Sequence, residues 1–389
     1  MTNNDRKVHS QLLDLSLHSD QLERILTPAL AIYPDMVHSN ITITLDLLDC
    51  NAEQWQPHVK TAKLQSTMRL LCDRGVKRFK CATTLEMLNA CEAGAEEVLM
   101  AYPCIGTRAS RVREIALANP QVRICATVEN IAQVDQWQGS PIALYIDINP
   151  GMNRTGIEQG STAEIVALAS HICQHGLEFA GLHYYDGQNR QADLELRKAE
   201  CSIGYEQLLR IIQAFADADL PVRTLITSGT PALPCALSFP GFHRKSFAHR
   251  VSPGTIVYND LSSLSQLPDG WDYRFAAIVI ASVISHPAPG LITCDAGHKA
   301  VSSDAGFPNC VVLGHPELEP QHPSEEHLPI RVAPGAPVPP IGEFLYLVPR
   351  HVCTTINNFD WALLVRGGKI IEVAAVSARG RESPLLPAL

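Results

Sequence analysis

Lys60 stands at the end of the run QPHVK, where a strand is expected to stop and a side chain to face a cavity. A lysine that is partly removed from water loses part of its preference for the charged form, and the neutral amine forms imines with aldehydes. A lysine at a strand end is more often an ordinary solvated side chain. Lys60 therefore becomes a candidate for covalent chemistry only if other strand ends supply matching groups.

Four other segments carry groups that suit one phosphorylated aromatic ligand. Residues 227–230, TSGT, form a small polar turn whose backbone N–H groups could surround a phosphate. Tyr258, in SPGTIVY, could donate a hydrogen bond to the same phosphate. Arg154, in DINPGMNRTG, can hold an anionic oxygen such as a phenolate, and Tyr185, in HYYDGQ, can pack on a planar ring.

His351 and Cys353 are separated by one residue in PRHVCTT. On an extended strand this spacing places the imidazole and the thiolate on the same face, where both could bind one metal ion. Two protein ligands would leave positions open for water and substrate, as in a catalytic site. The alternative, a core cysteine beside a packed histidine, stays open on these two residues alone.

The elements that must position these groups are short apolar runs that alternate with helical segments between about residues 55 and 258. We expect the strands to end at Lys60, Ala82, Tyr102, Val128, Ile148, Tyr185, Thr227 and near Val251. Apolar residues at helical spacing lie between them, as in TTLEMLNACEAG and STAEIVALASHICQHG. Eight such units predict a closed (β/α)₈ TIM-type barrel, an α/β fold whose active site lies at the carboxyl ends of the strands.

From about residue 266 the pattern changes to strands without long helices, including RFAAIVIASVISH, GLITCDAG, EFLYLVP and KIIEVAAV. This pattern predicts a separate, mainly antiparallel β domain. We place the barrel domain at residues 38–265 and the β domain, which carries the metal ligands, at residues 1–37 and 266–389. The stretch 315–340 is rich in proline and acidic residues and is expected to be a surface loop of that domain.

The composition favours a protein that acts on a small molecule and that resides in a reducing compartment. A net charge of -9 and a pI near 5.9 argue against a nucleic-acid partner, which usually needs a basic face. No run of about 18 apolar residues predicts a membrane span, and the first residues do not resemble a secretory leader. The twelve cysteines include no CxxC pair. We therefore expect a cytoplasmic protein with reduced thiols.

Nine motifs occur in one order along the chain: TPALAIY, QPHVKTAK, YIDINPGMNRTGIE, GLHYYDGQ, TSGTP, SPGTIVYND, DAGHKAVSSDAG, PSEEH and PRHVCTTIN. Together they resemble the D-serine dehydratase and D-threonine aldolase family, the metal-dependent branch of the alanine-racemase-like fold. The resemblance extends from about Thr27 to about Arg366.

The resemblance implies a cofactor, a set of site residues and an assembly. The cofactor is pyridoxal 5'-phosphate, held by Lys60 as a Schiff base, and a divalent metal is held by His351 and Cys353. The residues around the cofactor are Arg154, Tyr185, Ser228, Gly229, Thr230 and Tyr258, with Arg154 at the phenolate oxygen. The implied assembly is a head-to-tail homodimer in which the β domain of one subunit covers the barrel mouth of the other.

The expected activity, by the same resemblance, is that of a lyase on a D-β-hydroxy amino acid. Aldolase relatives carry His-x-Asp at the metal position, so Cys353 favours zinc over magnesium or manganese and favours dehydration. D-Serine or D-threo-3-hydroxyaspartate would then give a 2-oxo acid and ammonia. The alternative is D-threonine aldolase-type cleavage to glycine and an aldehyde. An amino-acid racemase and a non-catalytic pyridoxal-phosphate-binding protein are remoter alternatives.

Three positions depart from the family pattern. Ala62 and Gln188 stand where the family commonly has histidines, and Ile256 stands where it has the tyrosine of PGTY. A polar or acid–base group is thus missing twice from the barrel rim. These departures bear on the substrate and the reaction outcome and not on the cofactor.

Overall fold

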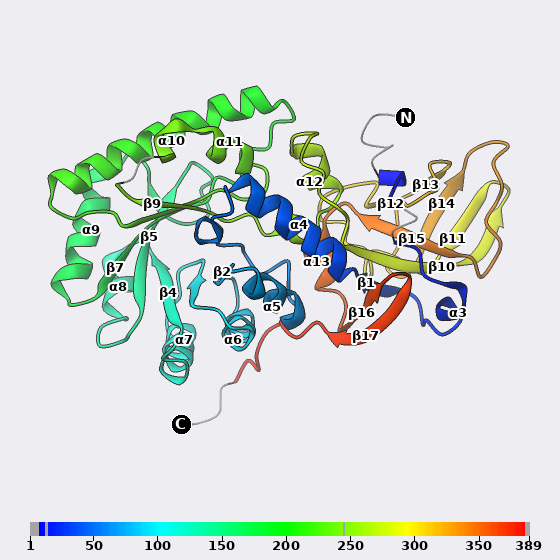
Figure 1. The fold of residues 1–389 in the computed structure, drawn as a ribbon, viewed down its shortest axis with the longest axis horizontal. Coiled ribbons are helices and arrows are strands. Elements are labelled where there is room, and N and C mark those ends of the chain that lie inside the picture. The colour runs from blue at the N-terminus through cyan, green and yellow to red at the C-terminus, as the bar shows by residue number, and fades with distance from the viewer. Residues whose placement is uncertain (1–7, 12–14, 244–245, 386–389) are drawn as a thin grey trace.

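The computed structural model describes residues 8–11, 15–243 and 246–385. Figure 1 shows two bodies side by side: a sheet ringed by helices, and a second sheet with few helices. Helix α4 (Pro34–Leu47) runs across the region where the two meet. The chain that leaves the last strand, β17 (Lys369–Ala375), turns back beneath the first body.

The first body is the predicted barrel. Its parallel strands follow the order β2, β3, β4, β5, β7, β8, β9, and β6 pairs with β5. Their bounds are β2 Arg78–Cys81, β3 Glu97–Met100, β4 Arg123–Val128, β5 Ala143–Asn149, β6 Ile157–Glu158, β7 Glu178–Tyr184, β8 Thr224–Thr227 and β9 Ala248–Val251. Parallel bridges from Trp55 to Val251 and from His58 to Lys80 join the two edges through residues 55–58. The sheet therefore closes, as the eight strand signals predicted.

The outer helices of the barrel include those that the apolar spacing predicted. Their bounds are α5 Gln65–Asp73, α6 Thr84–Ala93, α7 Thr107–Ala118, α8 Ile131–Asp135, α9 Thr162–Gln174, α10 Leu194–Asp217 and α11 Leu233–Ser238. Helix α6 shows how local sequence fixes such an element. Thr83 caps its first turn by accepting a hydrogen bond from the Glu86 N–H at 3.0 Å. Gly94 ends it at φ +101°, a conformation that side chains other than glycine rarely adopt.

The second body is mainly antiparallel, as predicted. Its strands are β1 Ala29–Ile32, β10 Ala277–Ala288, β11 Leu291–Cys294, β12 Cys310–Val312, β13 Leu318–Pro320, β14 Leu328–Val332, β15 Phe344–Pro349, β16 Trp361–Arg366 and β17. The early strand β1 pairs antiparallel with β10 and parallel with β16. The domain boundaries at residues 37/38 and 265/266 stay a prediction. Three short α-helices, α3 (Ser19–Leu22), α12 (Leu261–Gln266) and α13 (Val352–Ile356), and three 3₁₀ helices, η1 (Ala52–Gln54), η2 (Pro240–His243) and η3 (Thr255–Val257), are also present.

The prediction for residues 315–340 was wrong in part. That stretch contains β13 and β14, which pair with each other in the register Leu318↔Val332. Apolar residues at alternate positions in LPIRV bury one face of β14 against the domain core, and the flanking prolines obscured this pattern.

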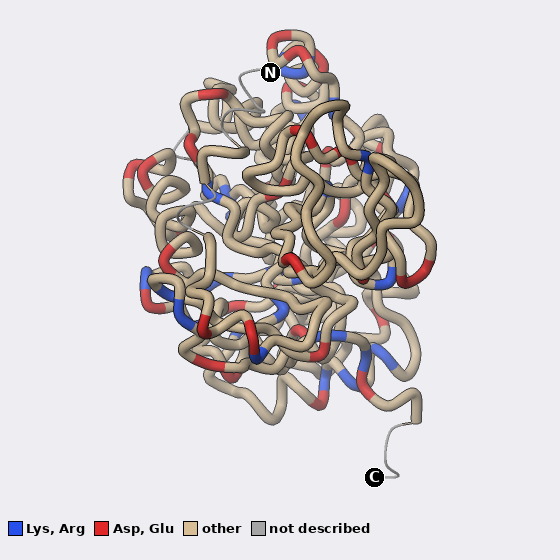
Figure 2. The backbone as a smooth tube through the Cα atoms, turned by 90° about the vertical axis from the view of Figure 1, so that its right-hand side faces the viewer, with Lys and Arg blue, Asp and Glu red and all other residues tan. Residues whose placement is uncertain are grey.

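No helix within the described residues has both the length and the apolar character that a membrane crossing requires. Figure 2 shows acidic and basic residues interspersed along the chain on the face it presents. All twelve cysteines are free, as predicted.

A buried ion pair joins the turn after Lys60 to helix α6. Lys63 Nζ lies 2.8 Å from Glu86 Oε1, with both side chains almost fully buried, and it also donates to the Ala378 carbonyl at 3.2 Å. We expect Glu86→Gln to lower the free energy of unfolding by about 3 kcal/mol, because it leaves the Lys63 charge buried without its counter-charge. Urea denaturation measures this loss. The matched control is Glu96→Gln in the exposed pair with Lys77, which should cost less than about 1 kcal/mol; equal losses would contradict the assignment.

Candidate active site

A cavity of about 360 Å³ lies at the carboxyl ends of the barrel strands, with the β domain forming part of its wall. Barrel residues and the metal-ligand candidates meet there: its lining includes Lys60, Tyr185, Gly229, Thr230, Ser252, His351 and Cys353. A second cavity of about 350 Å³ shares Lys60 and Tyr185 with it and extends to Arg154. The structure thus brings most of the predicted site residues to one region.

Lys60 lies in the turn that follows the bridged segment 55–58, so the strand pairing stops two residues before the end predicted at Lys60. Its backbone N–H donates to His58 Nδ1 at 3.2 Å. The Lys60 side chain is exposed in the single chain, so the expected partial removal from water does not come from this chain alone. Burial, and then the charges of Lys60 and Lys80, keep the pKa of His58 well below its usual value.

The turn after β8 has the character of an anion cradle. Ser228 adopts φ +56°, and the hydroxyl oxygens of Ser228, Thr230 and Ser252 are buried without a hydrogen-bond partner among the described residues. A Cβ on Gly229 would lie 2.9 Å from Tyr185 Cε2, and one on Gly254 would collide with the His58 carbonyl. Buried hydroxyls are normally paired, so three unpaired ones in one place indicate a missing acceptor. A phosphate supplies such acceptors.

The Tyr258 hydroxyl is bonded to groups outside this cradle, and its predicted contact with the phosphate stays a prediction. The hydroxyl donates to the Ala62 carbonyl at 2.9 Å and pairs with Thr67 Oγ1 at 2.7 Å, and the ring is fully buried. Ser252, six residues earlier, presents its free hydroxyl instead. Sequence alone could not decide which hydroxyl of SPGTIVY faces the cavity, because the 3₁₀ turn Thr255–Val257 rotates the chain between them.

Tyr185 and Arg154 meet at the opposite rim. The Arg154 guanidinium carbon lies 4.8 Å from the centroid of the Tyr185 ring. The same ring occupies the space that a side chain on Gly229 would need. Arg154 is exposed in the single chain. Behind them, Asp147 accepts from His183 Nδ1 at 2.6 Å and from Thr155 Oγ1 at 2.7 Å. Although burial favours the neutral acid, His183 holds the pKa of Asp147 below its usual value.

His351 and Cys353 meet as predicted, but not on one strand. Strand β15 ends at Pro349, His351 caps helix α13, and Cys353 is the second residue of that helix. The two side chains still lie close enough to affect each other's ionisation. Although burial opposes both ionisations, the pair raises the pKa of His351 to about 9 and lowers that of Cys353. The extended geometry failed because Asp260 accepts the Val352 N–H at 3.0 Å and so helps to start the helix.

Two further contacts orient the pair. Asp304 Oδ2 lies 2.7 Å from His351 Nδ1, and Asp304 Oδ1 accepts from Thr354 at 2.8 Å. Thr61 Oγ1 lies 2.9 Å from Cys353 Sγ, which ties the turn of Lys60 to helix α13 across the two bodies. A histidine that binds a metal through one ring nitrogen usually donates a hydrogen bond from the other ring nitrogen to a carboxylate. Asp304 is placed to accept such a bond.

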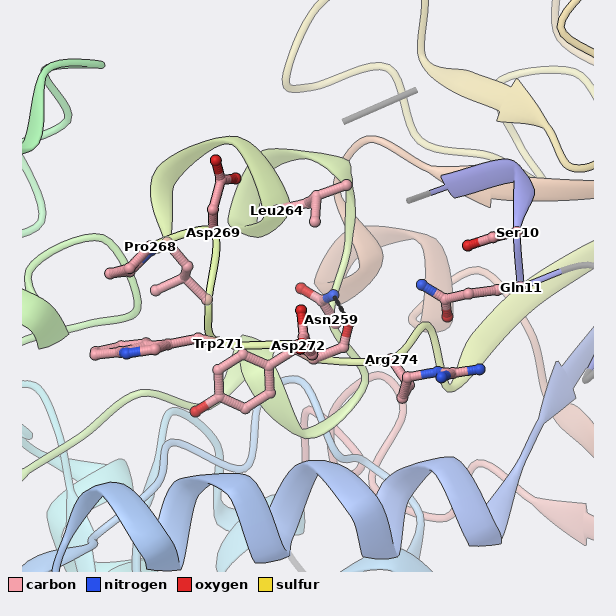
Figure 3. A pocket seen from close by; sticks show the side chains of 11 residues that line it. Ser10, Gln11, Asn259, Leu264, Pro268, Asp269, Trp271, Asp272 and Arg274 are labelled. Carbon is pink, nitrogen blue, oxygen red and sulfur yellow. Dashed lines mark hydrogen bonds between the residues drawn. The ribbon is translucent and has the colours of Figure 1, made fainter. Parts of the chain in front are cut away.

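Two other features lie away from this region. A cavity of about 200 Å³ between α12, the loop 267–274 and residues 10–11 contains Asn259, with Trp271 along its wall (Figure 3), and none of the predicted site residues lines it. Among the described residues, Asp135, His171 and His175 form a three-ligand cluster on the outside of the barrel, with their donor atoms within 4.8 Å of one another. His171 already hydrogen-bonds to Asp135 at 2.7 Å.

Sequence reasoning missed Lys80, Ser252 and Asp304. Lys80 interrupts the apolar strand RFKCA next to a strand end, a signal that could have marked it. Ser252 stood within a quoted motif. Asp304 lies 47 residues from His351, so only the fold pairs them.

Ser252→Ala is expected to weaken pyridoxal-phosphate binding by about 10-fold, since one charge-assisted hydrogen bond is lost. The melting temperature of the cofactor-free protein should not fall, because the Ser252 hydroxyl has no partner there to lose. Absorbance titration with the cofactor measures the affinity. Ser202→Ala on the outer helix α10 is the control; a normal affinity in Ser252→Ala would remove Ser252 from the cradle.

Comparison with known proteins places this arrangement in a family. Residues 34–262 match the family described as "Alanine racemase, N-terminal domain", and residues 276–365 match "Putative serine dehydratase domain". D-threonine aldolase from Arthrobacter sp is 26% identical over 93% of this chain and 94% of its own length. D-threo-3-hydroxyaspartate dehydratase from Delftia sp. (strain HT23) is 23% identical over 87% of this chain and 94% of its own.

A solved structure of D-threonine aldolase from Filomicrobium marinum superposes with a TM-score of 0.82 at 27% identity, over 91% of this chain and 96% of that one. The alanine racemase match alone spans more than half of the 389 residues. The chain therefore belongs to the alanine-racemase-like family, in the branch of the D-serine dehydratases and D-threonine aldolases.

Proposed function

We propose that the chain is a pyridoxal-phosphate- and metal-dependent lyase that converts a D-β-hydroxy amino acid, D-serine or D-threo-3-hydroxyaspartate, into a 2-oxo acid and ammonia. One observation carries the proposal: a single cavity holds the Lys60 amine, two of three unpaired buried hydroxyls, and the His351–Cys353 pair. Each group has a separate use in such a reaction. Together they have no common purpose in an ordinary barrel core.

The residues present fit the cofactor. Ser228, Thr230 and Ser252 would hold its phosphate, and Gly229 leaves the space that a side chain would fill. Lys60 would hold the cofactor covalently. Arg154 would contact its phenolate oxygen, and Tyr185 would pack against its ring.

The metal pair fits zinc best, because thiolate and imidazole are its preferred ligands. Asp304 would orient His351, and Thr61 would support the Cys353 sulfur. Two protein ligands leave room for water and for substrate oxygens. Magnesium or manganese is the alternative that a carboxylate in place of Cys353 would favour.

When bound, pyridoxal phosphate would withdraw electrons from the substrate Cα and the metal would act as a Lewis acid on the β-hydroxyl. The chain's own residues would do the rest. Lys60 would take the proton from Cα, since its amine faces the same cavity as the metal pair. Thr61 would keep that amine and the pair at a fixed separation.

A second outcome at the same site is retro-aldol cleavage to glycine and an aldehyde. The aldolase relative is 26% identical to this chain and the dehydratase relative 23%. Sequence similarity therefore favours neither reaction strongly. Cys353 is the feature that favours dehydration.

Product analysis tests the proposal. The protein, loaded with pyridoxal phosphate and zinc, would be incubated with D- and L-serine, D-threonine and D-threo-3-hydroxyaspartate, with and without a chelator. We expect chelator-sensitive 2-oxo acid and ammonia from a D-substrate. Glycine and aldehyde would assign the aldolase outcome, and turnover that persists without metal would contradict the role of His351 and Cys353.

We further propose a homodimer in the cytoplasm. The Lys60 and Arg154 side chains are exposed in the single chain, whereas imine chemistry needs a site closed to water, so a second subunit over the barrel mouth would complete it. Light scattering on the purified protein gives the mass. Twelve free cysteines suit a reducing compartment.

A further inference from the structure

Lys80 is a lysine in the site that the proposed chemistry does not use. It is the third residue of β2, its side chain is only 2% exposed, and it lines both cavities beside Lys60 and Tyr185. The Lys80 backbone is fixed from both sides, because its N–H donates to the Pro57 carbonyl at 2.9 Å and its carbonyl accepts from the Val59 N–H at 2.8 Å. The direction of its side chain into the barrel mouth therefore follows from the closure of the sheet.

The Lys80 amine has no hydrogen-bond acceptor among the described residues. Its one contact of note is with the Tyr185 ring, whose centroid lies 5.6 Å from Nζ. Two carboxylates act on the charge of Lys80, and neither accepts a hydrogen bond from it: Asp147 accepts from His183 and Thr155, and Asp186 accepts from the Tyr205 hydroxyl through Oδ2 while its Oδ1 has no partner among the described residues. A buried ammonium that lacks a paired anion is rare in proteins, because its removal from water is not offset.

The cavity around Lys80 is positively charged. Its lining includes Lys60, Lys80 and Arg154, with His58 and His183, and contains no carboxylate. Outside its wall, the Arg108 guanidinium lies 5.0 Å from the Tyr102 ring centroid. Burial first, and then Lys60 and Arg154, lower the pKa of Lys80 to about 7, against the opposing effect of Asp147 and Asp186. An incoming anion would restore its charged form.

We propose that Lys80 is the binding group for a carboxylate of the substrate, in the cavity between Tyr102 and Tyr185. The inference rests on the proposed function for the identity of the substrate, because every candidate amino acid carries a carboxylate. Lys80 also lines the first cavity, together with Thr230 and Ser252. The second cavity, which reaches Tyr102 and Arg154, is lined by none of the three unpaired hydroxyls, so its anion would lie beside the phosphate and not in its place. Two carboxylates are candidates: the α-carboxylate shared by all substrates and the side-chain carboxylate of 3-hydroxyaspartate.

Lys80→Met tests the inference, with Lys77→Met, an exposed lysine just before the same strand, as the matched control. In the cofactor-loaded protein we expect Lys80→Met to weaken malonate binding, measured by calorimetry, by about 10- to 100-fold. With substrates, a KM increase of that size for both D-serine and D-threo-3-hydroxyaspartate assigns the α-carboxylate. An increase confined to the hydroxyaspartate assigns the side-chain carboxylate.

The malonate measurement does not depend on turnover. It can therefore still be interpreted if the wild-type protein shows no lyase activity. Unchanged malonate affinity and unchanged KM, with only kcat or its pH profile altered, would overturn the inference and make Lys80 a proton-transfer group. Folding is checked by melting temperature. Below pH 7 Lys80→Met should melt no lower than wild type, because the burial cost of the charged lysine is fully present there and fades as pH rises above 7.

Discussion

Lys60→Ala is expected to reduce turnover by on the order of 10⁴-fold, because the amine that would both hold the cofactor and take the α proton is lost. Two lysines, Lys60 and Lys80, line the cavity, so the protein itself offers the competing assignment. Lys60 follows the first barrel segment and lies one residue before Thr61, the contact to Cys353. Lys80 is buried on β2 and lacks that link.

Borohydride reduction of the cofactor-loaded protein, followed by peptide mass analysis, identifies the lysine that carries the cofactor. We expect the label on the peptide that contains Lys60 and none in Lys60→Ala. Lys77→Ala should behave as wild type, since its side chain is exposed and paired with Glu96. A label on Lys80 in the wild-type protein would exchange the roles given to the two lysines.

Cys353→Ala is expected to abolish zinc binding and to lower turnover at least about 100-fold, because one of the two proposed protein ligands would be removed. Metal analysis should fall from one zinc per chain to near none. His351→Ala should do the same. Cys353→Asp should recover activity with manganese better than with zinc, since a carboxylate is the harder ligand.

Two control variants separate this site from other thiols and other metal positions. Cys50→Ser changes an exposed thiol that is far from Cys353 in the sequence. It should leave the zinc content and the turnover unchanged. His175→Ala disables the outer cluster of Asp135, His171 and His175, and should not alter the zinc count under stoichiometric loading. A full zinc equivalent retained by Cys353→Ala and lost by His175→Ala would place the metal on the barrel surface.

Much of the barrel could be predicted because its elements are locally encoded. Each buried parallel strand is a short apolar run, and each outer helix repeats apolar residues at helical spacing, so strand ends such as Tyr102 and Thr227 lay within a few residues of the observed ones. The first strand is the exception. Residues 55–58 make only isolated bridges, so the turn that carries Lys60 begins earlier than the apolar run suggested.

The parts that failed depend on contacts between distant segments. Helix α13 replaces the expected strand at Cys353 because Asp260, 92 residues earlier, accepts its first N–H. The hydroxyl of Tyr258 bonds to Thr67 and Ala62, 191 and 196 residues away, so its partners could not be read from the local motif. Lys80 was overlooked because its strand was treated only as an element that completes the barrel.

The proposed site breaks a bond at Cβ of a D-amino acid after the α proton is removed. Proton NMR of D-serine in D₂O, with the protein loaded with pyridoxal phosphate and zinc, follows both events in one sample. We predict loss of the D-serine signals with appearance of pyruvate, no reaction of L-serine, and arrest of pyruvate formation by a chelator. Formation of α-deuterated serine of both configurations without pyruvate would contradict the account and identify a racemase.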